Sequence, residues 1–522
     1  MTVAEWELTG GDYDGAGRAT RALKERLKQL GVDAAALRRA LIAAYEAEAN
    51  VVIHARRGTM RCYFGPGQLD VEVEDEGPGI PEIELALKEG FSTAPPAARE
   101  LGFGAGMGLP SIRRNTDRFS LQSTVGRGTR VTFSVRYRPQ DGGAAAGHSV
   151  AVDPARCKRC RACVRACPTH AVRLHENGPS ILEHLCIDCT ACLAACPTGA
   201  LALRGCADAP APAAGVTLVV PDPLLLQFGA EVPPERVLAA LDKLGYGDVR
   251  TLGPWDRGLR AAELEHLQSE HRTRPAISSF CPAVTNLVAA RFPGLLPQVV
   301  PLLSPLEAAH RALQDRPAVF VTLCPAQRSA LTSVTAHGAA ELVAPTGLLR
   351  ELLGVLAHRP RPACDAPAPA AAAPLGAPEV LRVTGLRHVA RVLDRAENGE
   401  LGDVHLLELW ACEGGCAGSP LLREEPAVAE HRARRLVTAS AAVAPAAPLP
   451  GPRTPRRGVR LDPDLGRAVR MLGEIDRLVR TLPGRDCGDC GAPSCRAFAE
   501  DVVLGRAVAD ACLHRGGEEG AK

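Results

Sequence analysis

The sequence predicts a multidomain protein of mixed α/β and α+β architecture. A chain of 522 residues is too long to fold around one hydrophobic core, since a domain of about 150 residues is typical. The hydrophobic pattern predicts both helices and strands. Residues 34–55 carry helical periodicity, whereas residues 69–74 and 129–135 alternate as strands do. Cysteine-dense stretches alternate with Pro- and Ala-rich ones, which also indicates several domains.

Four stretches rich in Pro, Ala and Gly divide the chain, at residues 138–149, 206–215, 359–378 and 438–455. The first two are expected linkers, and the third and fourth are too rich in Pro and Ala to hold a packed element. The third stretch has cysteines of one set on both sides, so we expect an insertion there and not a boundary. The expected domains are residues 1–137, 150–205, 216–436 and 460–522.

Charge and hydropathy exclude several classes of partner. The 61 basic and 59 acidic residues give a net charge of +2, which provides no electrostatic footprint for nucleic acid or an anionic membrane. The longest apolar runs are well short of the ~20 residues that a membrane span needs. No basic segment followed by an apolar one opens the sequence, so we expect a cytoplasmic protein.

The first domain carries candidate nucleotide-binding residues. Glu46, Asn50 and His54 lie four residues apart, so they share one face of the expected helix. Glycine-rich runs follow in the chain, and their candidate site residues are Asp75, Gly77, Gly79, Gly104, Gly106, Gly108 and Thr129. The alternative interpretation is a solvated helix face with a core or capping histidine.

In this order the runs resemble the N, G1, G2 and G3 boxes of the GHKL ATPases. The sequence around them is most similar to that of bacterial switch kinases and anti-sigma-factor serine kinases. The resemblance implies an α/β sandwich that binds ATP and Mg²⁺. It assigns Asn50 to Mg²⁺, Asp75 to the adenine amino group and the glycines to the phosphates. Glu46 would be the base that activates a serine hydroxyl on a partner.

Nineteen cysteines without a secretion signal indicate reduced thiols that are free to bind metals. Sixteen of them fall into four sets of four, which predicts about four [4Fe-4S] clusters. Cys62, Cys206 and Cys364 fit no set, and we expect them to be free thiols.

The second domain repeats the pattern C-x2-C-x2-C-x3-C-P. The first run contains Cys157, Cys160, Cys163 and Cys167, and the second contains Cys186, Cys189, Cys192 and Cys196. The doubled run resembles the bacterial two-cluster ferredoxins, in which the fourth cysteine of each run binds the other cluster. The resemblance therefore pairs Cys196 with the first three cysteines and Cys167 with the second three. A pair of zinc knuckles is the alternative.

The third domain spreads its set over the loops that contain Cys281, Cys324, Cys412 and Cys416. These loops resemble the signature loops of the [FeFe]-hydrogenase large subunit, which implies an α/β domain with a cubane. In that family the last cysteine, here Cys416, also bridges to a di-iron subcluster. Isolated core cysteines are the alternative, because Cys is often buried.

Three positions depart from the hydrogenase pattern. Phe280 replaces a proton-relaying cysteine, Gln327 replaces a lysine and Trp410 replaces a methionine. A phenylalanine cannot carry a proton, so general acid catalysis would be lost. We therefore expect a hydrogenase-like domain without efficient hydrogen turnover.

The fourth domain contains Cys487, Cys490, Cys495 and Cys512, spaced C-x2-C-x4-C-x16-C. This stretch resembles the 4Fe-4S domain in the B subunit of Rnf electron-transport complexes, which implies a small α-helical cluster domain. A zinc site is the alternative. The preceding segment, from Leu465 to Leu482, has apolar residues at helical spacing and predicts a packing helix.

Together these features favour a redox-sensing signalling protein. Its cluster relay would report electron supply to an ATP-binding, serine-kinase-like module. Expected partners are a ferredoxin or oxidoreductase and a regulatory protein such as an anti-sigma antagonist. A working [FeFe]-hydrogenase and a plain multi-cluster electron carrier are the rival hypotheses.

Overall fold

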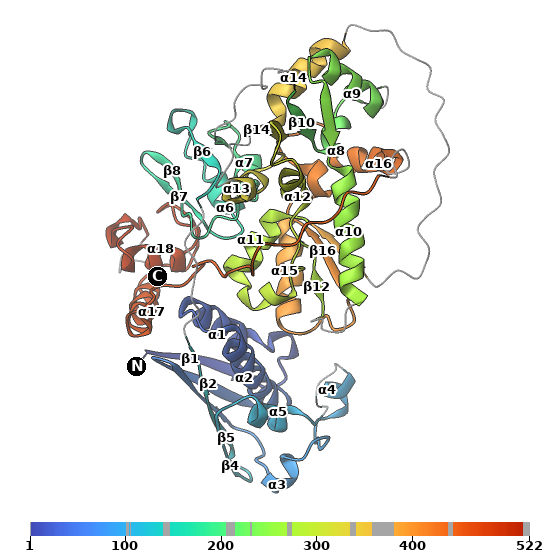
Figure 1. Ribbon diagram of the computed structural model, residues 1–522. Helices are drawn as coiled ribbons and strands as arrows, with labels where there is room; N and C mark the ends of the chain where they lie inside the picture. The colour runs from blue at the N-terminus through green and yellow to red at the C-terminus, as the bar shows by residue number, and fades with distance from the viewer. Residues whose placement is uncertain are drawn as a thin grey trace. The chain divides into compact units, whose positions relative to one another are not determined.

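The computed structural model describes residues 2–100, 104, 106–138, 147–204, 215–229, 232–268, 274–334, 341–357, 380–436 and 442–514 (Figure 1). Cys206, Cys364, the third Pro/Ala-rich stretch and most of the first two lie outside these residues. The chain forms two compact units. The first unit comprises Met1–Gly142, Val459–Cys490 and Ser494–Lys522, and the second comprises Gly143–Gly458 and Gly491–Pro493.

A five-stranded antiparallel sheet forms the base of the first unit, in the order β1-β2-β3-β5-β4. The strands are β1 (Thr2–Thr9), β2 (Arg57–Gly65), β3 (Gln68–Asp75), β4 (Arg118–Thr124) and β5 (Gly128–Arg136). Burial alternates along β2 and β3, as expected for a sheet with one face on the core. The strands predicted at 69–74 and 129–135 are confirmed as β3 and β5.

Helices cover the buried face of this sheet. The longest, α2 (Ala34–His54), confirms the helix predicted at 34–55, and it contacts β1, β2, β3 and β5. The Asp33 carboxylate caps its first turn by accepting a hydrogen bond from the Ala36 N–H. The other helices are η1 (Tyr13–Gly15), α1 (Arg18–Gln29), α3 (Ile83–Ala86), α4 (Pro96–Glu100) and α5 (Gly108–Arg114).

The C-terminal elements belong to this same unit. They are α17 (Leu465–Arg480), α18 (Cys495–Val503) and η5 (Ala509–Ala511). The packing helix predicted between Leu465 and Leu482 is confirmed as α17, which buries Leu472 and Ile475 and contacts α1, β1 and β2. The Thr2 hydroxyl donates a hydrogen bond to the Val469 carbonyl, 3.0 Å away. The chain therefore returns to its first domain after completing the second unit.

The second unit opens with a small module of two-stranded sheets. Strand β6 (Val150–Val152) pairs with β9 (Leu201–Leu203), and β7 (Val172–His175) pairs with β8 (Gly178–Ile181). Three short helices carry or flank the cysteine runs, namely η2 (Pro154–Arg156), α6 (Ala162–Ala166) and α7 (Ala191–Ala195). Cys163 and Cys192 take equivalent positions in α6 and α7, as the repeat predicts.

The rest of the second unit is α/β, with two parallel sheets. One contains β11 (Asp248–Thr251), β10 (Thr217–Val220), β13 (Ala318–Val321) and β14 (Glu341–Val343), and the other contains β12 (Ala276–Ile277), β16 (Leu406–Trp410) and β15 (Val380–Thr384). The helices are α8 (Asp222–Leu225), α9 (Pro234–Lys243), α10 (Gly253–Gln268), α11 (Pro282–Arg291), η3 (Pro293–Gln298), α12 (Pro305–Ala312), α13 (Pro325–Val334), α14 (Pro345–Leu356), α15 (Leu386–Glu397), η4 (Gly415–Gly418) and α16 (Pro426–Leu436).

The described part of the fourth Pro/Ala-rich stretch is packed against this unit, which corrects the expectation from composition. Ala444 N–H donates to the Pro254 carbonyl, and Leu449 N–H donates to the Pro301 carbonyl. Ala444, Ala447 and Leu449 also contact a buried hydrophobic cluster. Backbone hydrogen bonds to an existing surface stabilise this stretch without helix or strand formation.

None of the helices in the described part of the chain combines the length and apolar character that a membrane span requires.

Candidate functional site

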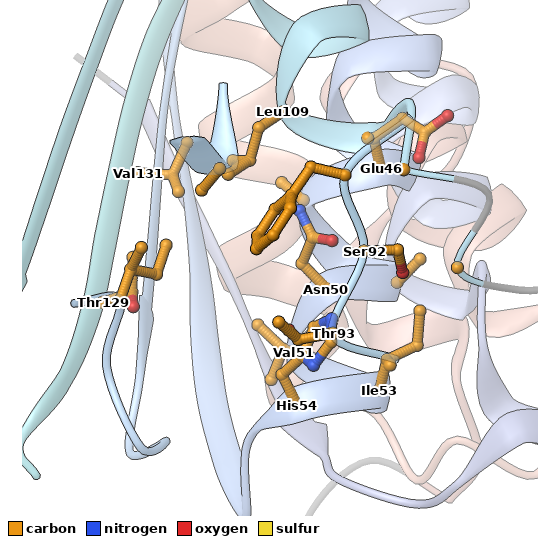
Figure 2. Close-up of a pocket in the computed structure, with 18 of the residues that line it drawn as sticks. Glu46, Asn50, Val51, Ile53, His54, Ser92, Thr93, Leu109, Thr129 and Val131 are labelled. Carbon is orange, nitrogen blue, oxygen red and sulfur yellow. The ribbon is translucent and has the colours of Figure 1, made fainter. Parts of the chain in front are cut away.

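A cavity of about 530 Å³ lies beside α2 in the first unit (Figure 2). This volume is in the range of small-molecule sites. Nine of the ten predicted nucleotide-site residues line it: Glu46, Asn50, His54, Asp75, Gly79, Gly104, Gly106, Gly108 and Thr129. Gly77 is not among the lining residues, and its N–H instead donates to the Asp75 carboxylate.

Glu46 and Asn50 face the start of α5 from one side of α2. A Cβ atom at Gly108 would lie 3.3 Å from both the Asn50 Oδ1 and a Glu46 carboxylate oxygen, so glycine allows this close approach. Burial raises the pKa of Glu46 and lowers the pKa of His54. A carboxyl group with a raised pKa binds a proton more readily, which suits a general base.

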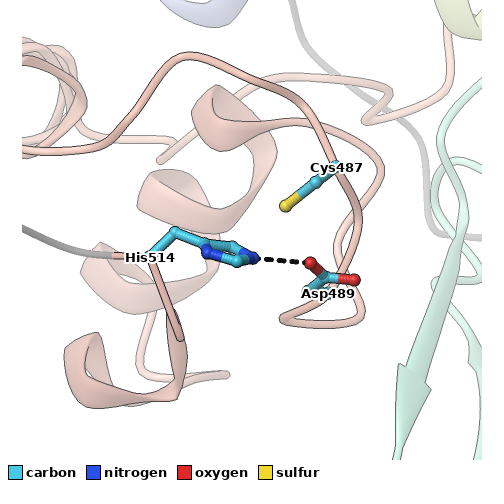
Figure 3. Close-up of side chains that lie close together, drawn as sticks. All are labelled: Cys487, Asp489 and His514. Carbon is cyan, nitrogen blue, oxygen red and sulfur yellow. Dashed lines mark hydrogen bonds and ion pairs between the residues drawn. The ribbon is translucent and has the colours of Figure 1, made fainter.

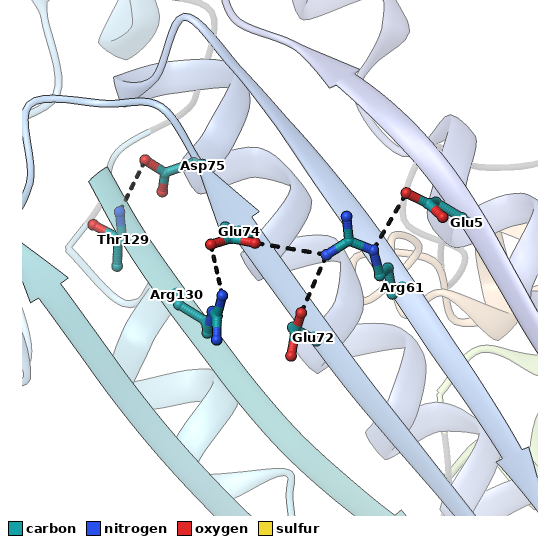
Figure 4. A network of polar contacts seen from close by, with 7 residues as sticks. All are labelled: Glu5, Arg61, Glu72, Glu74, Asp75, Thr129 and Arg130. Atoms are coloured by element: carbon teal, nitrogen blue, oxygen red, sulfur yellow. Dashed lines mark hydrogen bonds and ion pairs between the residues drawn. The ribbon is translucent and has the colours of Figure 1, made fainter. Parts of the chain in front are cut away.

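Asp75 ends β3 at the cavity, and its carboxylate is fixed by backbone donors. Thr129 N–H donates to the Asp75 Oδ1 over 3.2 Å (Figure 4). Burial raises the pKa of Asp75, whereas the N–H groups of Thr129 and Gly77 lower it. On the neighbouring strands, Arg130 pairs with Glu74 at 2.8 Å in an exposed position, which contributes little stability.

The glycine loop next to the cavity requires glycine at two positions. Gly104 and Gly106 have φ values of +80° and +73°, and a Cβ atom at Gly106 would lie 2.4 Å from the Gly90 carbonyl carbon. The sequence did not single out the other lining residues, among them Ile53, Ser92, Thr93, Leu109 and Val131 (Figure 2). Val131 lies two residues after Thr129 on β5 and so shares its face of the strand. This spacing could have identified Val131 from the sequence.

The dicluster module brings the thiols of its two runs together across the repeat. Burial raises the pKa of Cys163, and the neighbouring thiols of Cys196 and Cys157 raise it further. Burial also raises the pKa of Cys189, and the thiols of Cys167, Cys192 and Cys186 add to this effect. Cys167 lines one hollow with Cys186, Cys189 and Cys192 of the second run, whereas Cys196 lies near Cys163 of the first run, as the crossed arrangement predicts.

Cys281, Cys324, Cys412 and Cys416 line one hollow in the α/β part of the second unit. Cys189 of the dicluster module lines the same hollow, and the Thr190 hydroxyl lies 3.9 Å from the Cys412 sulfur. Burial raises the pKa of all four thiols, that of Cys412 to about 11. The second thiol set of the dicluster module is thus adjacent to the hydrogenase-like set.

The residues that depart from the hydrogenase pattern pack around this hollow. The rings of Phe280 and Trp410 meet edge to face, with centroids 5.7 Å apart. The Arg260 guanidinium lies 5.9 Å from the Phe280 ring centroid and 6.0 Å from that of Trp410. It also pairs with Glu408 at 2.6 Å. Arg260 was missed in the sequence because no spacing connects it to the cysteine loops.

The four C-terminal cysteines line another hollow, in the first unit. Asp486 accepts a hydrogen bond from the Cys495 N–H at 2.7 Å, which anchors the start of α18. Two residues that the sequence did not single out are Asp489 and His514, which hydrogen-bond at 2.7 Å (Figure 3). One ligand atom of each lies within 4.8 Å of the Cys487 sulfur. A Cys-Asp-His group also suits zinc, which is the alternative for this site.

A buried polar network joins the C-terminal helices to α1. Asp476 on α17 pairs with Arg26 at 3.3 Å and with Arg496 at 2.9 Å, and its side chain is 9% exposed. Arg496 follows the candidate ligand Cys495 and also donates to Gln29 at 2.7 Å. This network connects the cluster hollow to the C-terminal half of α1.

The other end of α1 is connected to the helix that carries Glu46 and Asn50. The Glu48 carboxylate accepts hydrogen bonds from the N–H groups of Ala19 and Thr20, at 3.1 and 2.9 Å. The Thr20 hydroxyl also donates to Glu48, at 2.7 Å. Glu48 is buried on α2, between the two predicted nucleotide-site residues. Helix α1 therefore contacts Glu48, which lies between Glu46 and Asn50 in the chain, and Arg496, which follows Cys495.

Of the cysteines outside the four sets, the structure describes Cys62 alone. It is fully buried on β2, and burial raises the pKa of its thiol.

Four family models match successive parts of the chain. They describe a histidine kinase-like ATPase domain at residues 12–135, a 4Fe-4S dicluster domain at 156–201, the C-terminal domain of the iron-only hydrogenase large subunit at 217–329, and an Fe-S cluster at 482–514. The chain thus combines a kinase-like ATPase module with iron–sulfur and hydrogenase-like domains.

Curated relatives match the ATPase module. The chain is 31% identical over 134 residues to the serine/threonine-protein kinase RsbT of Bacillus subtilis (strain 168), which is 25% of this chain and 88% of RsbT. It is 34% identical over 94 residues to an anti-sigma F factor of Caldanaerobacter subterraneus subsp. tengcongensis, which is 17% of this chain and 62% of that protein.

Solved structures of [FeFe]-hydrogenases are also similar. HydA(deltaEFG) is 15% identical and covers 42% of this chain and 83% of its own, with a TM-score of 0.33. A variant of HydA1 from Chlamydomonas reinhardtii is 15% identical and covers 44% of this chain and 86% of its own, with a TM-score of 0.34. At these scores the hydrogenase-like assignment depends on the family model.

Proposed function

Because this chain belongs to the family of the serine/threonine-protein kinase RsbT, we propose that it is a redox-sensing protein kinase. It binds Mg-ATP in the α2 cavity and holds about four [4Fe-4S] clusters, one for each set of four cysteines. Its target is a serine of a regulatory protein, such as an anti-sigma antagonist. The redox state of the cluster sites sets the activity or affinity of the nucleotide site.

The observation that carries this proposal is the packing of the C-terminal cysteine domain on the ATPase module within one compact unit. Helix α1 contacts α17 of the C-terminal cysteine domain through the Arg26–Asp476 ion pair, and it contacts α2 through the hydrogen bonds of Thr20 with Glu48. A change of charge or position near Cys495 can therefore reach Glu46 and Asn50 through two buried polar contacts. Coupling requires such a connected element with differential contacts in two states.

The residues of the cavity support phosphate transfer. Glu46 accepts the serine proton as the serine oxygen bonds to the γ-phosphorus and ADP leaves with the cleaved oxygen. Asn50 is the Mg²⁺ ligand, and Asp75 accepts from the adenine amino group. The loop of Gly104 and Gly106 approaches the phosphates without side chains that would block them.

The thiol-lined hollows fit iron–sulfur clusters, which supply one-electron redox chemistry when bound. Cys189 lines the hollow of the hydrogenase-like set, which supports electron exchange between the dicluster module and that domain. Phe280 gives the hydrogenase-like domain no proton donor before Cys281. We therefore assign it a cubane that receives electrons, without efficient hydrogen turnover.

The coupling is tested by removing the central carboxylate of the network. In Asp476→Asn the difference in Mg-ATP affinity between oxidised and reduced protein is expected to vanish, because Arg26 and Arg496 lose their shared partner. The measurement is anaerobic calorimetry on both redox forms. Glu474→Gln, an exposed position on the same helix, is the matched control and should keep the wild-type difference. An unchanged difference in Asp476→Asn would contradict the proposed route.

The crossed ligand pairing is tested by Cys196→Ser. We expect this change to alter the EPR signal of the cluster held by Cys157, Cys160 and Cys163, because Cys196 lies with that run. Cys167→Ser is the matched variant and should alter the other signal. If Cys196→Ser changes only the signal of the second run, the pairing is wrong.

A further inference from the structure

The two C-x2-C loops of the dicluster module share left-handed backbone angles at two equivalent positions, but one loop is buried and the other is exposed. In the first loop Arg159 and Arg161 have left-handed φ values of 54° and 63°. In the second loop Asp188 and Thr190, at the equivalent positions, have φ values of 56° and 69°. The repeat therefore presents its two candidate clusters through equivalent loops. Only the side chains decide what each loop binds.

The second loop is docked within this chain. Ile187 is 1% exposed and packs in the hydrophobic core of the hydrogenase-like domain. Asp188 is 4% exposed and accepts a hydrogen bond from the Ser329 hydroxyl on α13 at 2.6 Å. Thr190 is also buried and lies beside Cys412. Ile187, Asp188 and Thr190 therefore bind this loop to the hydrogenase-like domain of the same chain.

The first loop is exposed and basic. Five cationic residues, Arg156, Lys158, Arg159, Arg161 and Arg165, occur between residues 154 and 170, where the sequence has no acidic residue. Cys160 is exposed in the middle of this group, together with Lys158 and Arg159. The Arg165 guanidinium donates to the Cys160 carbonyl at 3.4 Å, which holds one of the cations against the loop. Since the whole chain has a net charge of only +2, this concentration of charge is local.

We propose that this basic loop is the docking surface for a small acidic electron-transfer protein. The proposal rests on the dicluster assignment within the proposed function. The second loop binds the hydrogenase-like domain of this chain, and the first loop binds the acidic partner. One electron passes from the reduced iron–sulfur centre of the acidic partner to the site of Cys157, Cys160, Cys163 and Cys196. Charge complementarity of this kind raises association rates by roughly 10–10³-fold at low ionic strength.

Binding of an acidic [2Fe-2S] ferredoxin to the full-length reconstituted protein tests the proposal. Calorimetry without ATP should show an affinity that falls steeply as salt rises from low to physiological concentration. Lys158→Glu/Arg159→Glu should lower the low-salt affinity at least tenfold and slow reduction by the reduced ferredoxin. Arg387→Glu/Arg391→Glu, which reverses the same charge at exposed positions of α15, should bind as the wild type does.

The EPR signals of the dicluster module should be the same in both variants, which separates lost docking from a lost cluster. Equal ferredoxin affinity in wild type and Lys158→Glu/Arg159→Glu would overturn the proposal, as would equally tight binding of a basic c-type cytochrome. Because ATP is absent, a failure of redox coupling to the nucleotide site would leave this result unaffected.

Discussion

Replacing Glu46 by glutamine is expected to lower phosphate transfer to the partner serine by about 10²–10⁴-fold, the usual contribution of a general base. Glutamine keeps the shape of the side chain beside Gly108 and Asn50, so Mg-ATP affinity should change little. The measurement is transfer of labelled γ-phosphate to the purified partner, with calorimetry for ATP affinity. Glu84→Gln, an exposed acid on α3, is the control and should transfer phosphate as the wild type does.

The pH dependence of the same reaction gives an independent check. A base acts in its deprotonated form, and burial raises the pKa of Glu46 above its ordinary value. The wild-type rate should therefore fall as the pH drops through this raised pKa, and Glu46→Gln should lack that limb. A glutamine variant with the wild-type rate and pH profile would exclude Glu46 as the base.

Hydrogen evolution from reduced viologen is expected to be lower than in hydrogenases with the relay cysteine by about 10²–10⁴-fold, since general acid catalysis is lost. Phe280 occupies the relay position, and its ring contacts both Trp410 and Arg260. Neither an aromatic ring nor an arginine, which stays protonated, can relay a proton. The assay uses protein that is co-expressed with hydrogenase maturases.

Infrared bands of metal-bound CO and CN⁻ provide the control, because they report separately whether a di-iron subcluster is present. If the bands are present, Phe280→Cys should raise the rate. Rates in the wild type that are comparable to those of authentic hydrogenases would contradict the assignment of this domain.

The nucleotide site was largely predictable from the sequence, because its residues recur at spacings that the backbone dictates. The four-residue spacing of Glu46 and Asn50 requires one helix face, and the positive φ values of Gly104 and Gly106 explain the glycine run. Gly77 was predicted as a cofactor-binding residue. It does not line the cavity, and its N–H donates to the Asp75 carboxylate.

The contacts between distant segments were not predictable. Asp476 and Arg26 are 450 positions apart in the chain. In the sequence, each of them looks like an ordinary solvent-exposed charge on an amphipathic helix. Composition also misjudged the stretch after Ala442, which packs through backbone hydrogen bonds and through contacts of Ala444, Ala447 and Leu449 with a buried hydrophobic cluster. Asp489 and His514 were overlooked because the cysteine spacing alone defined that site.

Redox coupling to ATP affinity is the central claim, and calorimetry of Mg-ATP binding to the wild-type protein tests it most directly. Oxidised and reduced protein, both reconstituted anaerobically, are titrated under the same conditions. A coupling free energy of the usual size gives affinities that differ by roughly 5–150-fold, and by reciprocity Mg-ATP shifts a cluster midpoint potential. Asn50→Ala should abolish binding in both forms, which shows that the heat comes from the α2 cavity. Affinities that differ between the two redox states are the predicted result, and equal affinities would contradict the account in favour of a plain electron carrier.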